Sequence, residues 1–287
     1  MHRNPIHFRI GAIDLSLRSE LDEVVQEFAA LYRPFRKDGN DSDNSIEMEV
    51  RSDRRAWYGR RRYHVFGDDR TIGRSRRRPE VMPYLEWGIN RQVIARHGEF
   101  LQVHAASLAR GNAGVIFAAN SGSGKSTLAA GLLSRGWKYL SDEFALIDAE
   151  TQWLHPFPKA LCIKSGAFKV VEQLNLHPWQ RRYYVKAFKG RVGYLRPHDV
   201  SDQPLASPSP IRFVIFPKYI EGAHPRLFPL SRAQAAFSLA KYVMNSGTFG
   251  NRSASLLADV VRQAVCFGLE SGPLEATCDL IESVLPE

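Results

Sequence analysis

The feature that most constrains this chain is a glycine-rich segment at residues 119–127, which reads Ala-Asn-Ser-Gly-Ser-Gly-Lys-Ser-Thr. It matches the P-loop pattern G-x-x-x-x-G-K-[ST] at every fixed position except the first, where Ala119 stands in place of glycine. Residues 115–119 are apolar, and residues 125–135 are rich in Ala and Leu. This order predicts a strand, a phosphate-binding loop and a helix.

Each residue type in the loop suits phosphate binding. Gly122 and Gly124 let successive N–H groups turn toward an anion, and a helix that begins near Lys125 points its positive end at the same anion. Lys125 supplies a point charge to the β- and γ-phosphates, and the Ser126 hydroxyl can ligate Mg²⁺. The residues expected to bind nucleotide are Asn120, Ser121, Gly122, Ser123, Gly124, Lys125, Ser126 and Thr127.

Two acids, Asp142 and Glu143, end a short predicted strand 17 residues after Lys125. We expect this strand to lie beside the strand that enters the loop. One carboxylate would hold Mg²⁺ together with Ser126, and the other would accept a proton from an attacking hydroxyl. An exposed acidic turn is the alternative.

His104 lies on a strand predicted at residues 101–108, next to the loop strand. It either hydrogen-bonds the catalytic acid or the phosphate, or it is a structural histidine. Phosphoryl transfer needs further cations, and Lys164, Lys189 and Arg212 are candidates. For each of them the alternative is a solvated surface cation.

The composition excludes several classes of protein. With 287 residues, 44% of them hydrophobic, the chain can bury a core without disulfides or metal. No apolar run approaches the ~20 residues of a membrane-spanning helix, and no secretory signal is visible. Three scattered cysteines argue against a disulfide framework or a zinc site. We therefore expect a cytoplasmic protein.

The positive charge is concentrated in one segment. Residues 51–78 hold eleven Arg and three Asp, a net +8 of the chain's +9. One interpretation is a solvated hairpin whose arginines pair with the acids at residues 38–49. Another is a docking surface for an acidic protein or peptide, and nucleic acid is the least favoured partner.

The hydrophobic pattern divides the chain. Residues 1–80 are predicted to form a small α+β domain that contains the Arg-rich segment, with a helix at 19–31 capped by Ser19 and paired strands at 45–51 and 63–66. A helix at 84–96 leads into a catalytic domain, residues 81–287. The other predictions there are a Pro/Ser-rich loop at 196–210, a strand at 211–216, and C-terminal helices near 231–245, 251–267 and 273–284.

The order of His104, the glycine loop and Ser141-Asp142-Glu143 resembles the catalytic core of the HPr serine kinase/phosphorylase superfamily. The chain is most similar to the HPr-kinase-related kinase A group. Further segments that carry the resemblance are 86–90, 104–106, 136–137, 158–164, 189–190 and 216–219, so it covers roughly residues 80 to 285.

The resemblance implies an α/β fold related to phosphoenolpyruvate carboxykinase, with the P-loop set in a mixed, largely antiparallel sheet. It also implies ATP- and Mg²⁺-dependent phosphorylation of a serine hydroxyl, with Asp142 as general base, Glu143 near Mg²⁺ and His104 as the active-site histidine. Relatives include kinases that phosphorylate lasso-peptide precursors, so a peptide or protein acceptor is expected.

The chain departs from the family in three places: Asp-Glu replaces Asp-Asp, Ala119 replaces glycine, and the Arg-Gly-Leu-Gly segment of the bifunctional enzymes is absent. Two other functions stay open, a small-molecule kinase with the same site and a nucleotide-binding regulatory protein without transferase activity. The sequence leaves open the acceptor, the nucleotide preference, the reverse reaction and whether the chain forms a homo-oligomer.

Overall fold

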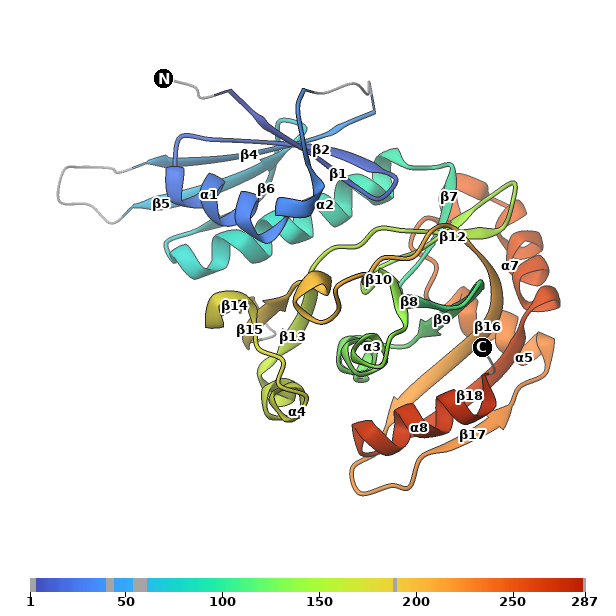
Figure 1. The fold of residues 1–287 in the computed structure, drawn as a ribbon. Helices are drawn as coiled ribbons and strands as arrows, with labels where there is room; N and C mark the ends of the chain where they lie inside the picture. The colour runs from blue at the N-terminus through green and yellow to red at the C-terminus, as the bar shows by residue number, and fades with distance from the viewer. Residues whose placement is uncertain (1–3, 40–43, 54–60, 188–189, 286–287) are drawn as a thin grey trace. The chain divides into compact units, whose positions relative to one another are not determined.

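A computed structural model of the chain describes residues 4–39, 44–53, 61–187 and 190–285. The fold is mixed α/β (Figure 1). The chain forms two compact units, of which the first comprises Met1–His97 with Pro178–Tyr194 and the second comprises Gly98–His177 with Leu195–Glu287. In the part of the chain that the structure describes, no helix is long and apolar enough to cross a membrane.

The first unit is built on a six-stranded sheet with the order β3-β1-β2-β4-β5-β6. Strands β2 and β4 pair in parallel, whereas the other neighbouring strands of this sheet pair antiparallel. The predicted pairing of residues 45–51 with 63–66 is confirmed by β4 and β5. The strands are β1 (Ile6–Ile10), β2 (Ile13–Ser19), β3 (Arg36–Lys37), β4 (Ile46–Asp53), β5 (Arg62–Gly67) and β6 (Arg70–Ser75).

Helix α1 (Asp22–Leu31) confirms the predicted N-terminal helix but begins later than expected. Ser19 is the last residue of β2 rather than the helix cap. Its hydroxyl donates to the carbonyl of Val50 at 2.8 Å and accepts the N–H of Leu21 at 3.1 Å. The hydroxyl therefore pairs with backbone groups at the end of β2, and α1 begins without a side-chain cap.

A buried carboxylate fixes α1 to other parts of the first unit. Glu27 pairs with Arg78, lies 3.2 Å from the guanidinium of Arg182, and accepts a 2.5 Å hydrogen bond from the hydroxyl of Tyr184. Burial and this carboxylate raise the pKa of Tyr184, so its hydroxyl stays protonated and donating. Residues 178–186 are in this way tied to α1 despite their distance along the chain.

The division between the units differs from the predicted division at residue 80. Helix α2 (Val81–Arg96) packs on β4, β5 and β6 and so belongs to the first unit. Residues 178–194, predicted as part of the second domain, also join the first unit and form a hairpin of β14 (Tyr184–Lys186) and β15 (Gly190–Leu195). The buried residues of α2, among them Leu85, Ile89 and Val93, explain the difference, because the helix packs on the strands of the first sheet.

A nine-stranded mixed sheet is the framework of the second unit. Its main path has the order β10-β8-β9-β16-β12-β11-β7, with β18 on β16 and β17 on β18. Only the pairs β9–β16 and β16–β18 are parallel within this described sheet. The strands are β7 (Phe100–Val103), β8 (Ala105–Arg110), β9 (Ala113–Ala118), β10 (Lys138–Ser141), β11 (Ala145–Asp148), β12 (Trp153–His155), β16 (Ser209–Tyr219), β17 (Arg226–Pro229) and β18 (Val265–Ser271).

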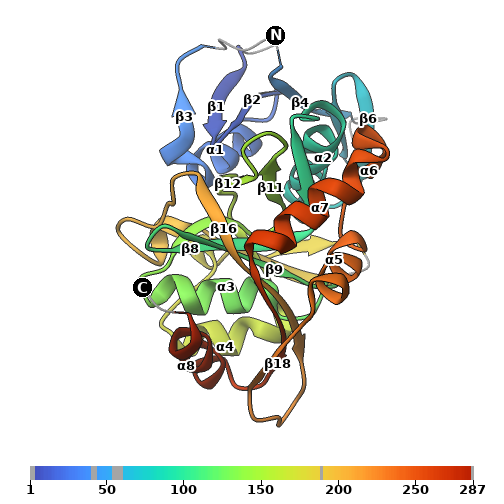
Figure 2. The same ribbon diagram turned by 90° about the vertical axis from the view of Figure 1, so that its right-hand side faces the viewer.

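Helices cover both faces of this sheet and bury one apolar cluster on each (Figure 2). On one face, α3 (Lys125–Ser134) and α8 (Leu274–Val284) pack around Trp137 and Phe117. On the other face, α5 (Arg232–Ala240) and α7 (Arg252–Gln263) pack around Ile116 and Val214. Strand β9 is thus buried on both faces, as its continuous apolar run predicts.

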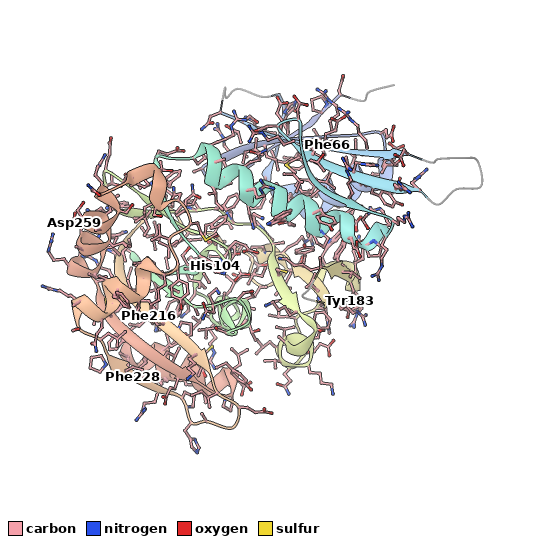
Figure 3. The ribbon with its side chains drawn as sticks, turned by 180° about the vertical axis from the view of Figure 1, so that it is seen from behind. Phe66, His104, Tyr183, Phe216, Phe228 and Asp259 are labelled. Atoms are coloured by element: carbon pink, nitrogen blue, oxygen red, sulfur yellow. The ribbon has the colours of Figure 1, made fainter. Side chains whose placement is uncertain are left out.

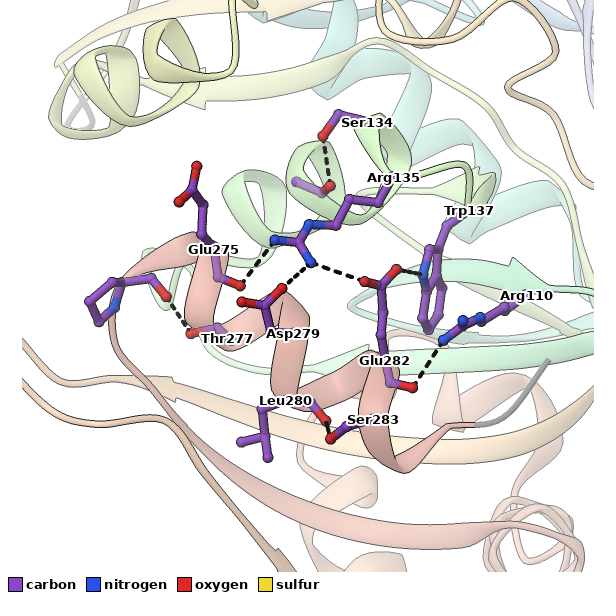
Figure 4. A network of polar contacts seen from close by, with 12 residues as sticks. Arg110, Ser134, Arg135, Trp137, Glu275, Thr277, Asp279, Leu280, Glu282 and Ser283 are labelled. Atoms are coloured by element: carbon purple, nitrogen blue, oxygen red, sulfur yellow. Dashed lines mark hydrogen bonds and ion pairs between the residues drawn. The ribbon is translucent and has the colours of Figure 1, made fainter.

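A polar network fixes α8 to the end of α3 (Figure 4). Arg135, directly after α3, pairs with Asp279 and lies 3.0 Å from Glu282. The indole N–H of Trp137 donates to the same glutamate at 3.0 Å, and Arg110 donates to its backbone carbonyl at 3.2 Å. The helix that begins at the glycine loop is therefore held at its far end.

Three expectations for this unit are corrected. The strand predicted at 101–108 is broken at His104 into β7 and β8, which pair with different neighbours. Strand β10 pairs with β8, so β8 lies between it and the loop strand β9. The helix predicted at 251–267 ends at Gln263, and β18 follows because its backbone pairs in parallel with β16.

Candidate active site

Three predicted site residues lie at one edge of the second sheet. Strands β9 and β10 are both antiparallel to β8, so their C-terminal ends and the N-terminal end of β8 lie together. The glycine loop follows β9, Asp142 follows β10, and His104 directly precedes β8. The adjacency expected between β9 and β10 is wrong, but the topology still brings these residues to the same edge.

Backbone N–H groups gather at the glycine loop and at the start of α3. Gly122 and Gly124 have φ values of +98° and +84°, which residues with a Cβ rarely adopt. Gly124 is the N-cap of α3 and makes no side-chain cap hydrogen bond. The first N–H groups of α3 therefore have no partner within the helix and point toward the loop. This arrangement suits a phosphate group.

Lys125 is nine-tenths buried beneath the loop. Its ammonium group donates to the carbonyls of Ala119 at 2.6 Å and Asn120 at 3.0 Å. The Nζ atom also lies 3.5 Å from Nε2 of His104. The carbonyls of the loop thus hold the ammonium group of Lys125 at the place where the loop would bind a phosphate.

His104 is labelled in Figure 3. Its contacts define which of its ring nitrogens carries the proton. Nδ1 lies 3.2 Å from the backbone carbonyl of Glu143, and a carbonyl can only accept. Nδ1 is therefore the donor, which leaves the lone pair of Nε2 for the ammonium of Lys125. His104 connects the acidic segment after β10 to the lysine of the glycine loop.

The backbone around His104 is fixed by residues 242–245, which were predicted as the end of a helix at 231–245, whereas α5 ends at Ala240. The His104 N–H donates to the carbonyl of Tyr242 at 2.7 Å, and Val103 forms a bridge with Val243. Asn245, which is buried, donates to the carbonyl of Phe100 and accepts the N–H of Gln102. Residues 242–245 therefore act as a short additional strand beside β7.

Asp142 is a buried carboxylate whose charge is poorly compensated. Burial first, and then the charge of Glu143, raise its pKa from 3.8 to about 7. The Ser126 side chain, the charge of Lys125 and the N–H of Cys162 act in the opposite direction. The Cys162 N–H lies 3.3 Å from Oδ2, whereas Oδ1 is buried and has no hydrogen-bond partner among the described residues. A carboxyl with a pKa near neutrality can exchange a proton during a reaction.

The oxygen atoms at this edge suit Mg²⁺ better than a softer metal. Ser126, Asp142 and Glu143 offer hydroxyl and carboxylate oxygens, and the unpartnered Oδ1 of Asp142 needs a donor or a cation. Among the described residues there is no group of three or more His, Cys, Asp or Glu that could hold a metal. The ion would therefore complete its coordination with phosphate oxygens and water, as Mg²⁺ commonly does.

Strand β13 (Leu161–Lys164) brings two further groups to the site. The Nζ atom of Lys164 donates to the hydroxyl of Ser121 at 3.2 Å and lies 3.7 Å from the point where a Cβ on Gly122 would be. The N–H of Cys162, two residues earlier, contacts Asp142. Lys164 thus contributes its side chain and Cys162 its backbone N–H. Only Lys164 was predicted here.

The structure describes only one of the other two predicted cations. Lys189 lies outside the described residues. Arg212 is near the start of β16, where Ile211 pairs with Gly114 and Ile215 pairs with Phe117. Because β16 runs parallel to β9, Arg212 lies toward the edge of the sheet opposite the glycine loop.

Tyr219 is a neighbour of the loop to which sequence reasoning gave no role. It ends β16, and its side chain is 54% exposed. Its Cβ lies 4.0 Å from the point where a Cβ on Gly124 would be. An exposed aromatic ring beside a phosphate loop was not predictable, because the parallel pairing of β9 with β16 brings together residues almost a hundred positions apart.

No protein-family model matches the chain, and no curated protein matches its sequence. Solved structures do match, and one of them is the HPr(Ser) kinase/phosphatase from Coxiella burnetii. That alignment covers 42% of this chain and 60% of the other, with 16% identity and a TM-score of 0.25. The match thus spans less than two thirds of that protein, and a similarity of this size describes neither the site nor its chemistry.

Proposed function

We propose that the chain is an ATP- and Mg²⁺-dependent kinase that transfers the γ-phosphoryl group to a hydroxyl, most specifically a serine of a peptide or protein. The observation that carries this proposal is the placement of Asp142. It is a buried carboxyl with a pKa of about 7, at the edge of the sheet where α3 presents its uncapped N-terminus. A nucleotide-binding protein without transferase activity has no need of such a group.

The transfer has a simple balance. The acceptor oxygen forms a bond to the γ-phosphorus while the bond from that phosphorus to the β–γ bridging oxygen breaks, and ADP leaves. Asp142 takes the proton of the acceptor hydroxyl. Lys125 and the N–H groups at the start of α3 hold the phosphates and stabilise the charge that develops on them.

Mg²⁺ would supply positive charge that neutralises the phosphates of the nucleotide. Ser126, Asp142 and Glu143 are the residues that would hold it. His104 positions Lys125 through Nε2 and hydrogen-bonds the backbone carbonyl of Glu143 through Nδ1. Lys164, above Ser121, is placed to approach the terminal phosphate, and the exposed ring of Tyr219 offers a face on which the nucleobase can stack.

A peptide acceptor is supported by free arginines in the first unit. Arg51, Arg61, Arg77 and Arg78 pair with glutamates, but of these four partners only Glu49, which pairs with Arg51, belongs to the acids at residues 38–49 that the solvated-hairpin interpretation names. Arg70 and Arg74 on the edge strand β6 have no ion pair among the described residues. Residues 54–60 of the Arg-rich segment lie outside the described residues. Unpaired guanidinium groups can bind an acidic peptide.

The test is phosphate transfer from γ-labelled ATP with Mg²⁺, with a lysate and small encoded peptides as acceptors. A peptide or protein labelled by the native enzyme and not by the Asp142→Asn variant supports the proposal. Changing Arg70 and Arg74 to Gln should then raise KM for that peptide without changing KM for ATP. Label only on a small molecule would instead establish a metabolite kinase, for which those arginines are irrelevant.

A further inference from the structure

A pocket lies in the second unit, toward the edge of the sheet opposite the glycine loop. Its volume is about 730 Å³, within the range of small-molecule sites. It is bounded by Asn112 in the β8–β9 turn, Lys138 at the start of β10, Trp153 on β12 and Arg212 on β16. The loop at the other ends of these strands has no residue in this lining.

The charge of the pocket has one sign. Lys138 and Arg212 contribute two cations, and none of its lining residues is acidic. Among the described residues no carboxylate pairs with the Arg212 guanidinium. Lys138 donates one hydrogen bond, to the carbonyl of Gln203 at 2.6 Å, and an ammonium group has two further N–H donors. A ligand here would therefore be an anion.

Trp153 adds a flat apolar surface to the cations. Its side chain is 45% exposed, although an indole of this size is normally covered in a folded protein. It pairs in register with Pro210 across β12 and β16, so the pocket has an aromatic ring and a proline ring together. Flat rings stack on such surfaces.

The wall formed by residues 205–210 is fixed by the backbone rather than left as a free loop. Leu205 forms a parallel bridge with Tyr139, and the N–H of Ala206 donates to the Tyr139 carbonyl at 3.0 Å. The hydroxyl of Ser209 donates to the carbonyl of Ser207 at 2.8 Å. The Pro/Ser-rich segment predicted as a loop therefore has a defined shape here.

We propose that this pocket binds a small aromatic anion, with its ring on Trp153 and its anionic group attracted by the cations of the lining, Lys138 and Arg212. Arg212 and Tyr219 are seven residues apart on β16, which corresponds to roughly 23 Å along a strand. A ligand in this pocket is consequently separate from a nucleotide at the glycine loop, and the proposal does not depend on kinase activity.

The test is calorimetric titration of the full chain with 2-naphthoate. Acetate and 2-naphthalenemethanol serve as probes that have only the anionic group or only the ring. We expect saturable binding of 2-naphthoate and much weaker binding of the other two. Arg212→Gln should weaken binding about tenfold and Trp153→Leu about fivefold. Lys125→Ala and Lys169→Gln, which remove cations elsewhere, should change nothing.

Two results would overturn the proposal. One is the absence of saturable 2-naphthoate binding at millimolar concentration. The other is binding that is unchanged by Arg212→Gln and Trp153→Leu, or abolished by Lys125→Ala, which would place the probe at the glycine loop. Because Arg212 is exposed, its variant should unfold at the same temperature as the native protein, and Lys138→Gln provides a second substitution of the same kind.

Discussion

His104 and Lys125 lie 3.5 Å apart, Nε2 to Nζ, because the residue before β8 and the loop after β9 meet at the open end of the β8–β9 hairpin. The carbonyl of Glu143 fixes the proton of His104 on Nδ1, so the unprotonated Nε2 can accept a hydrogen bond from the ammonium group of Lys125. A histidine that acts through Lys125 is a positioning residue, and this role differs from that of the proton acceptor Asp142.

Replacing His104 with alanine should lower kcat roughly 10- to 100-fold, as is usual when a group that orients a catalytic residue is lost. The affinity for ATP should fall less, because the loop carbonyls still hold Lys125. His104→Asn retains a donor near the position of Nδ1 and should recover part of the rate. Equal rates for the native and alanine enzymes in steady-state assays would contradict the role.

Lys125→Ala should lower turnover by at least about 100-fold, because it removes the cation at the β- and γ-phosphates. Steady-state kinetics measures the loss, and circular dichroism checks the fold. The matched control is Lys169→Gln, which changes an exposed lysine on α4 (Phe168–Gln173) and should leave turnover unchanged. A Lys125→Ala enzyme with near-native turnover would remove the glycine loop from the mechanism.

Asp142→Asn should slow transfer by at least about 100-fold. The same substitution should stabilise the free protein near neutral pH. The pKa of Asp142 is raised by burial to about 7, so the folded state binds its proton more tightly than the unfolded state. Stability therefore falls as pH rises from about 4 to about 7. The variant escapes this loss, so its gain in Tm should be larger at pH 8 than at pH 4.5.

Asp148→Asn provides a control of opposite sign. Burial acts to raise the pKa of Asp148, but hydrogen bonds from Thr151 and Glu150 outweigh it and lower the pKa. Its contribution to stability is present above the unfolded pKa and is lost as pH falls through the folded pKa. Asp148→Asn should therefore lower Tm at pH 8, and a rise like that of Asp142→Asn would refute the linkage argument.

Tyr219→Ala should weaken ATP binding roughly fivefold or more, because stacking of a base on an aromatic ring is worth ~1–3 kcal/mol. Tyr219→Phe should bind ATP normally. Inorganic tripolyphosphate, which has no base, should bind the native and alanine proteins equally in calorimetry. ATP and GTP should be affected alike, since stacking uses a face that every base has. If tripolyphosphate binding also fell, the defect would lie in the loop.

Glu27→Ala should destabilise the first unit by about 3 kcal/mol, because it leaves Arg78, Arg182 and Tyr184 without their shared partner. Hydrogen exchange of β14 should accelerate. Glu23→Ala on the same helix removes an exposed pair with Arg61 and should cost under about 1 kcal/mol. Similar effects of the two variants would deny the buried network a special role.

The sequence predicted those parts of the site that rest on local signals. The glycine loop and the start of α3 at Lys125 depend on nearby residues and on backbone conformations that glycine favours. The prediction for Asp142 also rested on spacing, and the topology places it at the edge of the sheet where the loop lies.

The rest depends on contacts between distant segments. A short helical crossover favours adjacent parallel strands, yet β8 lies between β9 and β10 because the preceding hairpin occupies that place. The N–H of Cys162 on Asp142, the Tyr242 carbonyl on His104 and the position of Tyr219 follow from pairings without a local pattern. The same global register, rather than any property of the residue itself, carries Arg212 away from the loop.

The most direct measurement is single-turnover transfer from γ-labelled ATP in the presence of Mg²⁺, with a serine-containing acceptor found in the lysate screen. The native protein and Asp142→Asn would be compared at equal, independently measured ATP occupancy. The account predicts a labelled serine in the first case and at least a ~100-fold slower reaction in the second. Tight ATP binding without label in either protein, or equal rates in both, would contradict it.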